Sequence, residues 1–262
     1  MVGKVFDWLD LRLGIRDIDA ALVSRNVPKL NWWYTLGFMA LFTFILMAVT
    51  GMFLAVYYAP TPDHAYDSVK YLTEEVMFGK VVRGLHHYGA SAMVIIVCMH
   101  MLQVFFYGAY KYPRELTWVT GALLLFMTMM MGLTGYLLVW DQKAYWATVV
   151  AVNITAQAPI LGPYLGQILR AGPEFGQNTL SRFYSIHMLL IPGGIATFIA
   201  IHLALVSKLG IAETPWSKRR LAVEAEEEDA KRRAARERIA HGRTPVPAGQ
   251  PAPDPVRTEV DA

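Results

Sequence analysis

Four of the seven histidines form two spaced pairs within apolar sequence. His86 and His100 are 14 residues apart, and His187 and His202 are 15 apart. Fourteen residues are two heptads, so a supercoiled helix carries both imidazoles on one face, about 21 Å apart along its axis. Two such helices side by side would present two His–His pairs at two depths. A histidine pair is a suitable axial ligand set for haem iron, so the spacing predicts two haem sites in a helical bundle.

Two other interpretations of these histidines are weaker. Ordinary packing is possible for one residue, but ionisable side chains inside apolar spans are rare and usually functional. A zinc cluster would need ligands close together, and pairs about 21 Å apart in depth cannot form one tetrahedral site. His87 points about 100° away from His86 on a helix and is not expected to be a ligand.

Glycines repeat with the same period on two further apolar segments. Gly37 and Gly51 are 14 residues apart, as are Gly121 and Gly135. Glycine lets a backbone approach a flat macrocycle closely. Small residues also occur where membrane helices pack together, which is the competing explanation. The shared period favours clearance for haem.

Cations lie near both ends of the histidine-bearing segments. Arg83 and Arg182 precede the first histidine of each pair, whereas Arg114 and Lys208 lie toward the other rim. Arginine pairs well with carboxylates, so these side chains are candidate partners for haem propionates. Snorkelling of the same side chains to lipid headgroups is the alternative.

The elements that must position these residues are long and free of charge. Four stretches without Asp, Glu, Lys or Arg each exceed the roughly 20 residues that a helix needs to cross a bilayer. The fold class is therefore expected to be all-α, an integral membrane four-helix bundle that holds two b haems between the second and fourth helices. The expected spans are residues 32–58, 80–108, 116–138 and 180–207.

The rest of the chain divides around this domain of residues 31–210. Residues 1–30 are expected to form an amphipathic lead-in at the membrane surface, with a solvated helix on a partner as the alternative, and 141–178 a surface segment of short helices. Residues 211–262 form a charged tail, with a solvated helix followed by Pro-rich disorder. Eighteen of the 24 Lys and Arg residues fall on the side that holds both termini, which predicts cytoplasmic termini in a bacterial plasma membrane.

Several motifs resemble the cytochrome b family of quinol-oxidising bc-type complexes, in particular its short, split form represented by cytochrome b6. The resemblance covers about residues 4–216. It is carried by Arg83-Gly-Leu-His86-His87, Tyr112-Pro-Arg-Glu-Leu-Thr-Trp118, Gly132-Leu-Thr-Gly-Tyr136, Trp140-Asp-Gln142 and Leu180-Ser-Arg-Phe-Tyr-Ser-Ile-His187.

The resemblance implies a role for each matched position. His86 and His187 would hold an outer b-type haem, and His100 and His202 an inner one, both bound without covalent links. Electrons would pass from quinol oxidised on the outer side to quinone reduced on the inner side, coupled to proton translocation. The outer quinol pocket would be bordered by Tyr136, Trp140, Asp141 and Trp146, and the inner quinone site by Asn31 and Lys208.

The same resemblance implies partners. A second membrane subunit would carry the C-terminal cytochrome b part, including the Pro-Glu-Trp-Tyr motif that completes the outer pocket. A Rieske-type iron–sulfur protein and a cytochrome c-type subunit would accept electrons, within a dimeric complex surrounded by lipid. No nucleic-acid partner is expected, and the chain is not expected to be active alone.

Three positions depart from the pattern. Thr35 replaces a cysteine that tethers an additional haem in the b6 form, and Cys98 lies off the histidine face, so no covalent haem is expected. Val139 replaces a proline, and Ser207 replaces an arginine near the inner quinone site. Two other functions stay open at this stage: a di-haem anchor for a dehydrogenase or hydrogenase, and a non-redox membrane scaffold or transporter.

Overall fold

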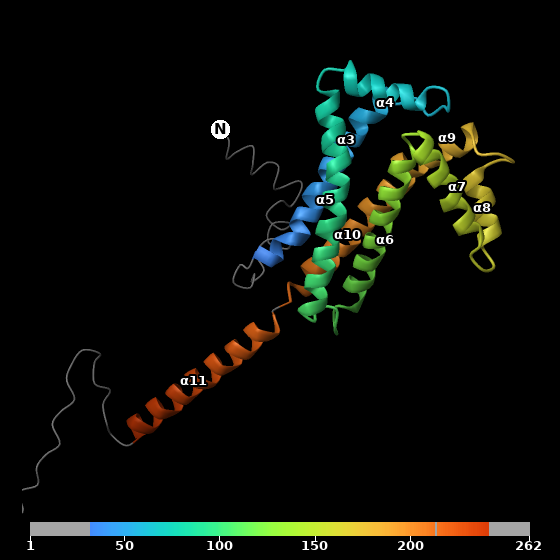
Figure 1. Ribbon diagram of the computed structural model, residues 1–262. Helices are drawn as coiled ribbons and strands as arrows, with labels where there is room; N and C mark the ends of the chain where they lie inside the picture. The colour runs from blue at the N-terminus through green and yellow to red at the C-terminus, as the bar shows by residue number, and fades with distance from the viewer. Residues whose placement is uncertain (1–31, 213, 241–262) are drawn as a thin grey trace, which may run out of the picture. The chain divides into compact units, whose positions relative to one another are not determined.

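The computed structural model describes residues 32–212 and 214–240, and the regular elements of this part are helices (Figure 1). The chain divides into two compact units, Met1–Ala212 and Glu213–Ala262. The predicted lead-in of residues 1–30 and the Pro-rich end of the tail lie outside the described residues.

Four helical segments are long and apolar enough to cross a membrane, as predicted. The first is α3 (Leu36–Tyr57), which a 3₁₀ turn, η1 (Trp32–Thr35), precedes. The second and third are α5 (Gly79–Phe106) and α6 (Glu115–Leu137). The fourth is built from α9 (Gln177–Ser185), a π-helical turn η2 (Ile186–Leu190) and α10 (Ile191–Leu209).

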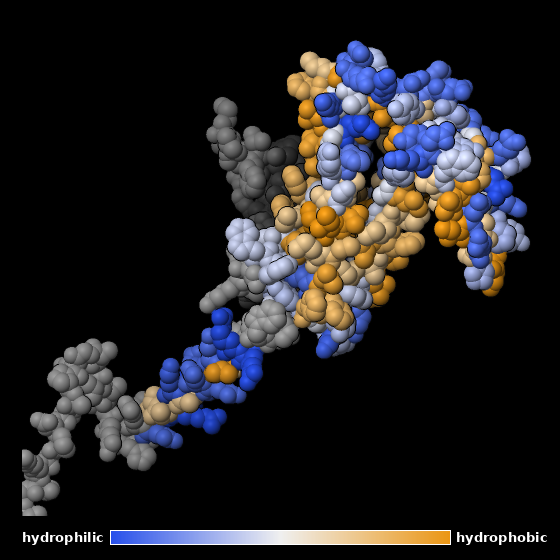
Figure 2. All heavy atoms as spheres, viewed as in Figure 1, coloured by the Kyte–Doolittle hydropathy of each residue, from blue (hydrophilic) through white to orange (hydrophobic). Residues whose placement is uncertain are grey.

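The long helices expose apolar side chains instead of burying them. Between 6% and 17% of the most apolar window of each helix is buried within the protein. Figure 2 shows hydrophobic side chains along the middle of the helices, with hydrophilic ones gathered around α4 and the neighbouring loops. A lipid environment explains this distribution, because hydrocarbon does not penalise exposed Leu, Ile and Phe as water does.

Short helices connect the spans on one side. They are α4 (Ala65–Glu74), which the sequence reading did not include, and α7 (Gln142–Ala156) and α8 (Gly162–Arg170) within the predicted surface segment. Asp141 caps α7, since its side chain accepts a 2.7 Å hydrogen bond from the Ala144 amide. Leu137, Val152 and Phe183 form a small buried core that fixes α7 against α6 and α9.

The histidine-bearing helices pack mainly on different neighbours. α5 packs along α3 and more lightly on α6, whereas α10 packs along α6. The bundle is therefore two helix pairs, α3 with α5 and α6 with α10, and each pair combines a glycine-bearing helix with a histidine-bearing one.

The second unit contains α11 (Pro215–Ala240), a highly charged helix. Its ion pairs are local: Arg220 contacts Glu224 at 3.4 Å, and Arg232 contacts Glu228 at 2.7 Å. Exposed pairs at this spacing add only a few tenths of a kcal/mol each, roughly 0.3–0.5. This helix lies where the sequence predicted a solvated helix, within the charged tail of residues 211–262.

Candidate functional site

Two cavities lie within the bundle, and each contains one of the expected histidine pairs. The larger, about 800 Å³, is lined by His86 and His187. The smaller, about 320 Å³, is lined by His100 and His202. Both volumes fall in the range of sites that bury cofactors, roughly 300–1,000 Å³.

The pair in the larger cavity has the geometry of two ligands on one metal. The ring centroids of His86 and His187 are 6.4 Å apart, with the ring planes at 75°. Two imidazoles that bind one metal from opposite sides, at metal–nitrogen distances of about 2 Å, put their centroids roughly 6 Å apart. The space between these rings therefore fits one iron atom.

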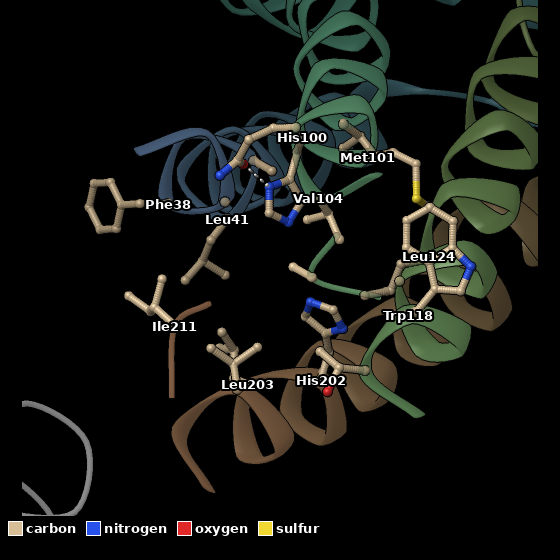
Figure 3. A pocket seen from close by; sticks show the side chains of 18 of the residues that line it. Phe38, Leu41, His100, Met101, Val104, Trp118, Leu124, His202, Leu203 and Ile211 are labelled. Atoms are coloured by element: carbon tan, nitrogen blue, oxygen red, sulfur yellow. Dashed lines mark hydrogen bonds between the residues drawn. The ribbon is translucent and has the colours of Figure 1, made fainter. Parts of the chain in front are cut away.

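The second pair also faces across its cavity. Figure 3 shows His100 and His202 pointing toward one another across the smaller cavity, from α5 and α10. Leu41, Val104 and Leu124 contribute apolar walls, which suit a hydrophobic macrocycle.

Each expected glycine faces one histidine. A Cβ atom on Gly37 would lie 3.3 Å from Cε1 of His100, and one on Gly51 would lie 3.1 Å from Cε1 of His86. On α6, the corresponding distances are 3.3 Å from Gly121 to His202 and 2.6 Å from Gly135 to His187. The glycines thus make room for the imidazole rings themselves, a reason that the period alone did not reveal.

The π-helical turn explains the longer histidine interval on the fourth span. On an α-helix, 15 residues turn about 100° further than 14, which would rotate His202 away from the face of His187. In η2, the Ile191 amide bonds to the Ile186 carbonyl five residues earlier, so one extra residue is absorbed beside His187. Pro192 follows directly and has no amide proton for an α-helical bond, which favours this turn.

Several known proteins are similar to this chain in sequence and in fold. The family model described as Cytochrome b/b6/petB matches residues 22–210. The chain belongs to the cytochrome b family. The cytochrome b6 of Prochlorococcus marinus strain MIT 9515 is 41% identical over 211 residues, which cover 80% of this chain and 97% of that protein. The cytochrome b6 of strain NATL1A is 40% identical over the same length.

A solved structure supports the same family membership. A chain of a hyperthermophilic respiratory Complex III matches with a TM-score of 0.70 and 37% identity, over 80% of this chain and 56% of that chain. These relationships favour a cytochrome b of the bc or b6f type over a dehydrogenase anchor or a non-redox scaffold, and they make the chain a multi-pass membrane protein.

Three threonines that the sequence reading missed hold the histidines of this cytochrome b. Oγ1 lies near Nδ1 at 2.9 Å for Thr50 and His86, 3.0 Å for Thr134 and His187, and 3.0 Å for Thr120 and His202. Each threonine directly precedes one of the expected glycines, so a Thr-Gly dipeptide at the 14-residue period was the available signal. The fourth histidine, His100, contacts no threonine of the described residues in this way; its Nδ1 lies 3.3 Å from Oε1 of Gln103.

The expected cations lie in different surroundings. Arg83 lines the larger cavity and Arg114 the smaller one, where it also donates 3.1 and 3.4 Å bonds to the Leu209 and Gly210 carbonyls. Arg182 instead donates to the Ile168 carbonyl in α8. Lys208 lies exposed in the last turn of α10.

The expected quinol-pocket residues are only partly together. Tyr136 and Asp141 line the larger cavity. The Trp140 ring packs edge-on against Tyr145, and Trp146 is 59% exposed with a 3.3 Å bond to Gln142. Asn31, expected at the inner quinone site, lies outside the described residues.

Two further side chains line the larger cavity. His87, not expected to be a ligand, is exposed and packs edge-on with Tyr88. Tyr58 donates a 2.6 Å hydrogen bond to the Leu138 carbonyl and so joins the ends of α3 and α6. Burial, with a smaller contribution from Tyr184, raises the pKa of the Tyr58 hydroxyl, which keeps its proton for this bond.

Proposed function

We propose that this chain is the di-haem cytochrome b subunit of a quinol:cytochrome c or plastocyanin-type oxidoreductase. The observation that carries the proposal is the pair of facing histidine sets in two cavities, one above the other in the bundle. Two carriers at two depths connect the two sides of a membrane, which a single site would not do.

His86 and His187 would be the axial ligands of an outer b haem, and His100 and His202 those of an inner one. When bound, haem supplies reversible one-electron chemistry within the membrane. The chain's own residues provide the ligands, hold the imidazole rings in place, clear space with glycine and exclude water with apolar walls.

Charged and polar residues at the cavities support the same assignment. Arg83, at the larger cavity, and Arg114, at the smaller one, would pair with haem propionates. Arg182, which donates a hydrogen bond to the Ile168 carbonyl in α8, would lie at the rim of the outer site. Quinol would be oxidised beside Tyr136 and Asp141, with Trp140 and Trp146 bordering the same region. Quinone would be reduced near Lys208 and Asn31.

The proposed complex needs other subunits. As the similarity to cytochrome b6 suggests, a second membrane subunit would carry the C-terminal cytochrome b part; this chain spans 97% of the cytochrome b6 chain and 56% of the related Complex III chain. A Rieske-type iron–sulfur protein and a cytochrome c-type subunit would carry the other electron, in a dimeric, proton-translocating complex. With 18 of the 24 Lys and Arg residues on their side, the termini would face the cytoplasm of a bacterial cell.

Purification of the complex through a tag on this chain tests the proposal. We expect two b haems per chain in a pyridine haemochrome assay, two midpoint potentials in a redox titration, and co-purification of an iron–sulfur subunit. A preparation with no haem would refute the proposal, and co-purification with a dehydrogenase or hydrogenase in place of an iron–sulfur subunit would favour the anchor role.

A further inference from the structure

The four candidate ligands are not held alike. Three histidines contact a threonine that precedes the facing glycine on the neighbouring helix. At the fourth site, Leu36 precedes Gly37 and offers no hydroxyl. His100 contacts Gln103 instead, a residue one turn further along its own helix, at the hydrogen bond drawn dashed in Figure 3.

The threonines are arranged to accept from the imidazoles, because each hydroxyl has a backbone carbonyl on its own helix to which it can donate. A hydroxyl has one proton. Thr50 donates its proton to the Leu46 carbonyl at 2.7 Å, and Thr134 donates to the Met130 carbonyl at 2.8 Å. Thr120 likewise donates to backbone carbonyls on its own helix at 3.0 Å. Each histidine therefore donates from Nδ1, which leaves the Nε2 lone pair free for a metal.

Gln103 can do the same for His100. Its amide oxygen has no proton and accepts from Nδ1. Gln103 is 9% exposed, so water does not readily replace its amide as the partner of Nδ1 if the amide is removed. An acceptor at Nδ1 makes a histidine ligand more basic and favours the ferric over the ferrous state.

We propose that Gln103 is the positioning residue of His100, which fixes its tautomer and lowers the potential of the inner haem, as the threonines do at the other three ligands. The inference rests on the proposed function, because it needs iron at Nε2. At the inner site, one histidine would then be held by a residue of its own helix, α5. At the outer site, both histidines would be held by residues of neighbouring helices, α3 and α6.

Redox titration of the intact complex in membranes tests this, with Gln103→Met as the first variant. Methionine is unbranched and apolar and removes the acceptor. Loss of an outer-shell partner typically changes metal affinity about tenfold or more. A tenfold loss of preference for ferric iron is a positive shift of about 59 mV for a one-electron couple. We expect this shift for the inner haem alone.

A second variant adds Leu36→Thr to Gln103→Met. Position 36 stands before Gly37 as the threonines stand before their glycines, so the new hydroxyl should return the potential toward the wild-type value. Thr50→Val should raise only the outer potential, and Thr50→Ser, which keeps the hydroxyl, should leave it unchanged.

Three results would overturn the inference: an unchanged inner potential in Gln103→Met, an equal shift of both haems, or loss of the inner haem that Leu36→Thr does not restore. Loss that Leu36→Thr does restore would support it. Wild-type complex without haem would instead refute the proposed function, so the two failures are distinguishable.

Discussion

Among the four glycines that face the histidines, Gly135 should be the least able to accept a side chain. A Cβ there would lie 2.6 Å from Cε1 of His187, whereas ordinary contacts begin at 3.4 Å, so 0.8 Å of overlap must be relieved. His187 is buried, and its Nδ1 is held by Thr134, the residue next to Gly135. The ring cannot move away without straining that bond or leaving its place opposite His86.

The expected cost of Gly135→Ala follows from this overlap. Overpacking of a filled site costs about 1–3 kcal/mol, and a functional constellation tolerates displacements of only about 0.5 Å. If the cost falls on the haem-bound state, outer-haem affinity decreases roughly 5- to 150-fold. The inner haem should be retained, because its ligands lie about 21 Å away along the helices.

The measurement is the haem content of purified complex, with the two haems distinguished by their reduced absorption bands and potentials. Gly193→Ala is the matched control, since a Cβ there meets no atom within 4 Å and the residue does not line either cavity. Gly121→Ala, with 3.3 Å to His202, should have a smaller effect, and on the inner haem. A Gly135→Ala complex with both haems at wild-type potentials would refute the steric reasoning.

Three other outcomes are expected. His202→Ala should lose the inner haem and keep the outer one, and a variant that retains both by haemochrome assay would contradict the ligand assignment. Deleting Leu189 should preserve both haems, because the π-helical turn can then become α-helical. Deleting Ile95, which lies between the histidines of α5, should instead cause the loss of one haem. Equal haem contents in the two variants would argue that η2 does not set the alignment of His187 and His202. Denaturing electrophoresis with a haem stain should show no band at this chain's mass, since the Thr35 hydroxyl does not form a thioether and bonds to the Trp32 carbonyl at 2.6 Å.

The spans and the facing histidines were predictable because their signals are strong and local. A charge-free run longer than a bilayer crossing has few alternatives to a helix. The 14-residue interval then leaves His86 and His100 on nearly the same side of α5 without knowledge of any neighbour. Helix α4 was not predicted, because its ten residues are of mixed polarity and contain no long apolar run.

The polar contacts were not predictable in the same way. Whether Arg182 reaches a cofactor or the Ile168 carbonyl depends on where α8 folds back, and no feature of residues near 182 encodes that position. Trp140 similarly depends on a turn in which its φ is 54°, after α6 has ended at Leu137. Such placements arise from packing between segments, which sequence spacing does not record.

The threonines and the π-helical turn show why a periodic pattern can be correct and still incomplete. Threonine in a membrane helix usually returns its hydroxyl to its own backbone, and Thr50, Thr120 and Thr134 do this too, so nothing in one helix distinguishes them. Their second contact exists only because α3 and α6 each lie beside a histidine-bearing helix at matched depth. The same matching requires His187 and His202 to lie on one face of the fourth span despite an interval of 15, and the π-helical turn η2 absorbs the extra residue. Each glycine must lie at the same depth in the membrane as the imidazole that it makes room for. The spacing of the glycines on α3 and α6 is therefore set by the spacing of the histidines on the helices beside them.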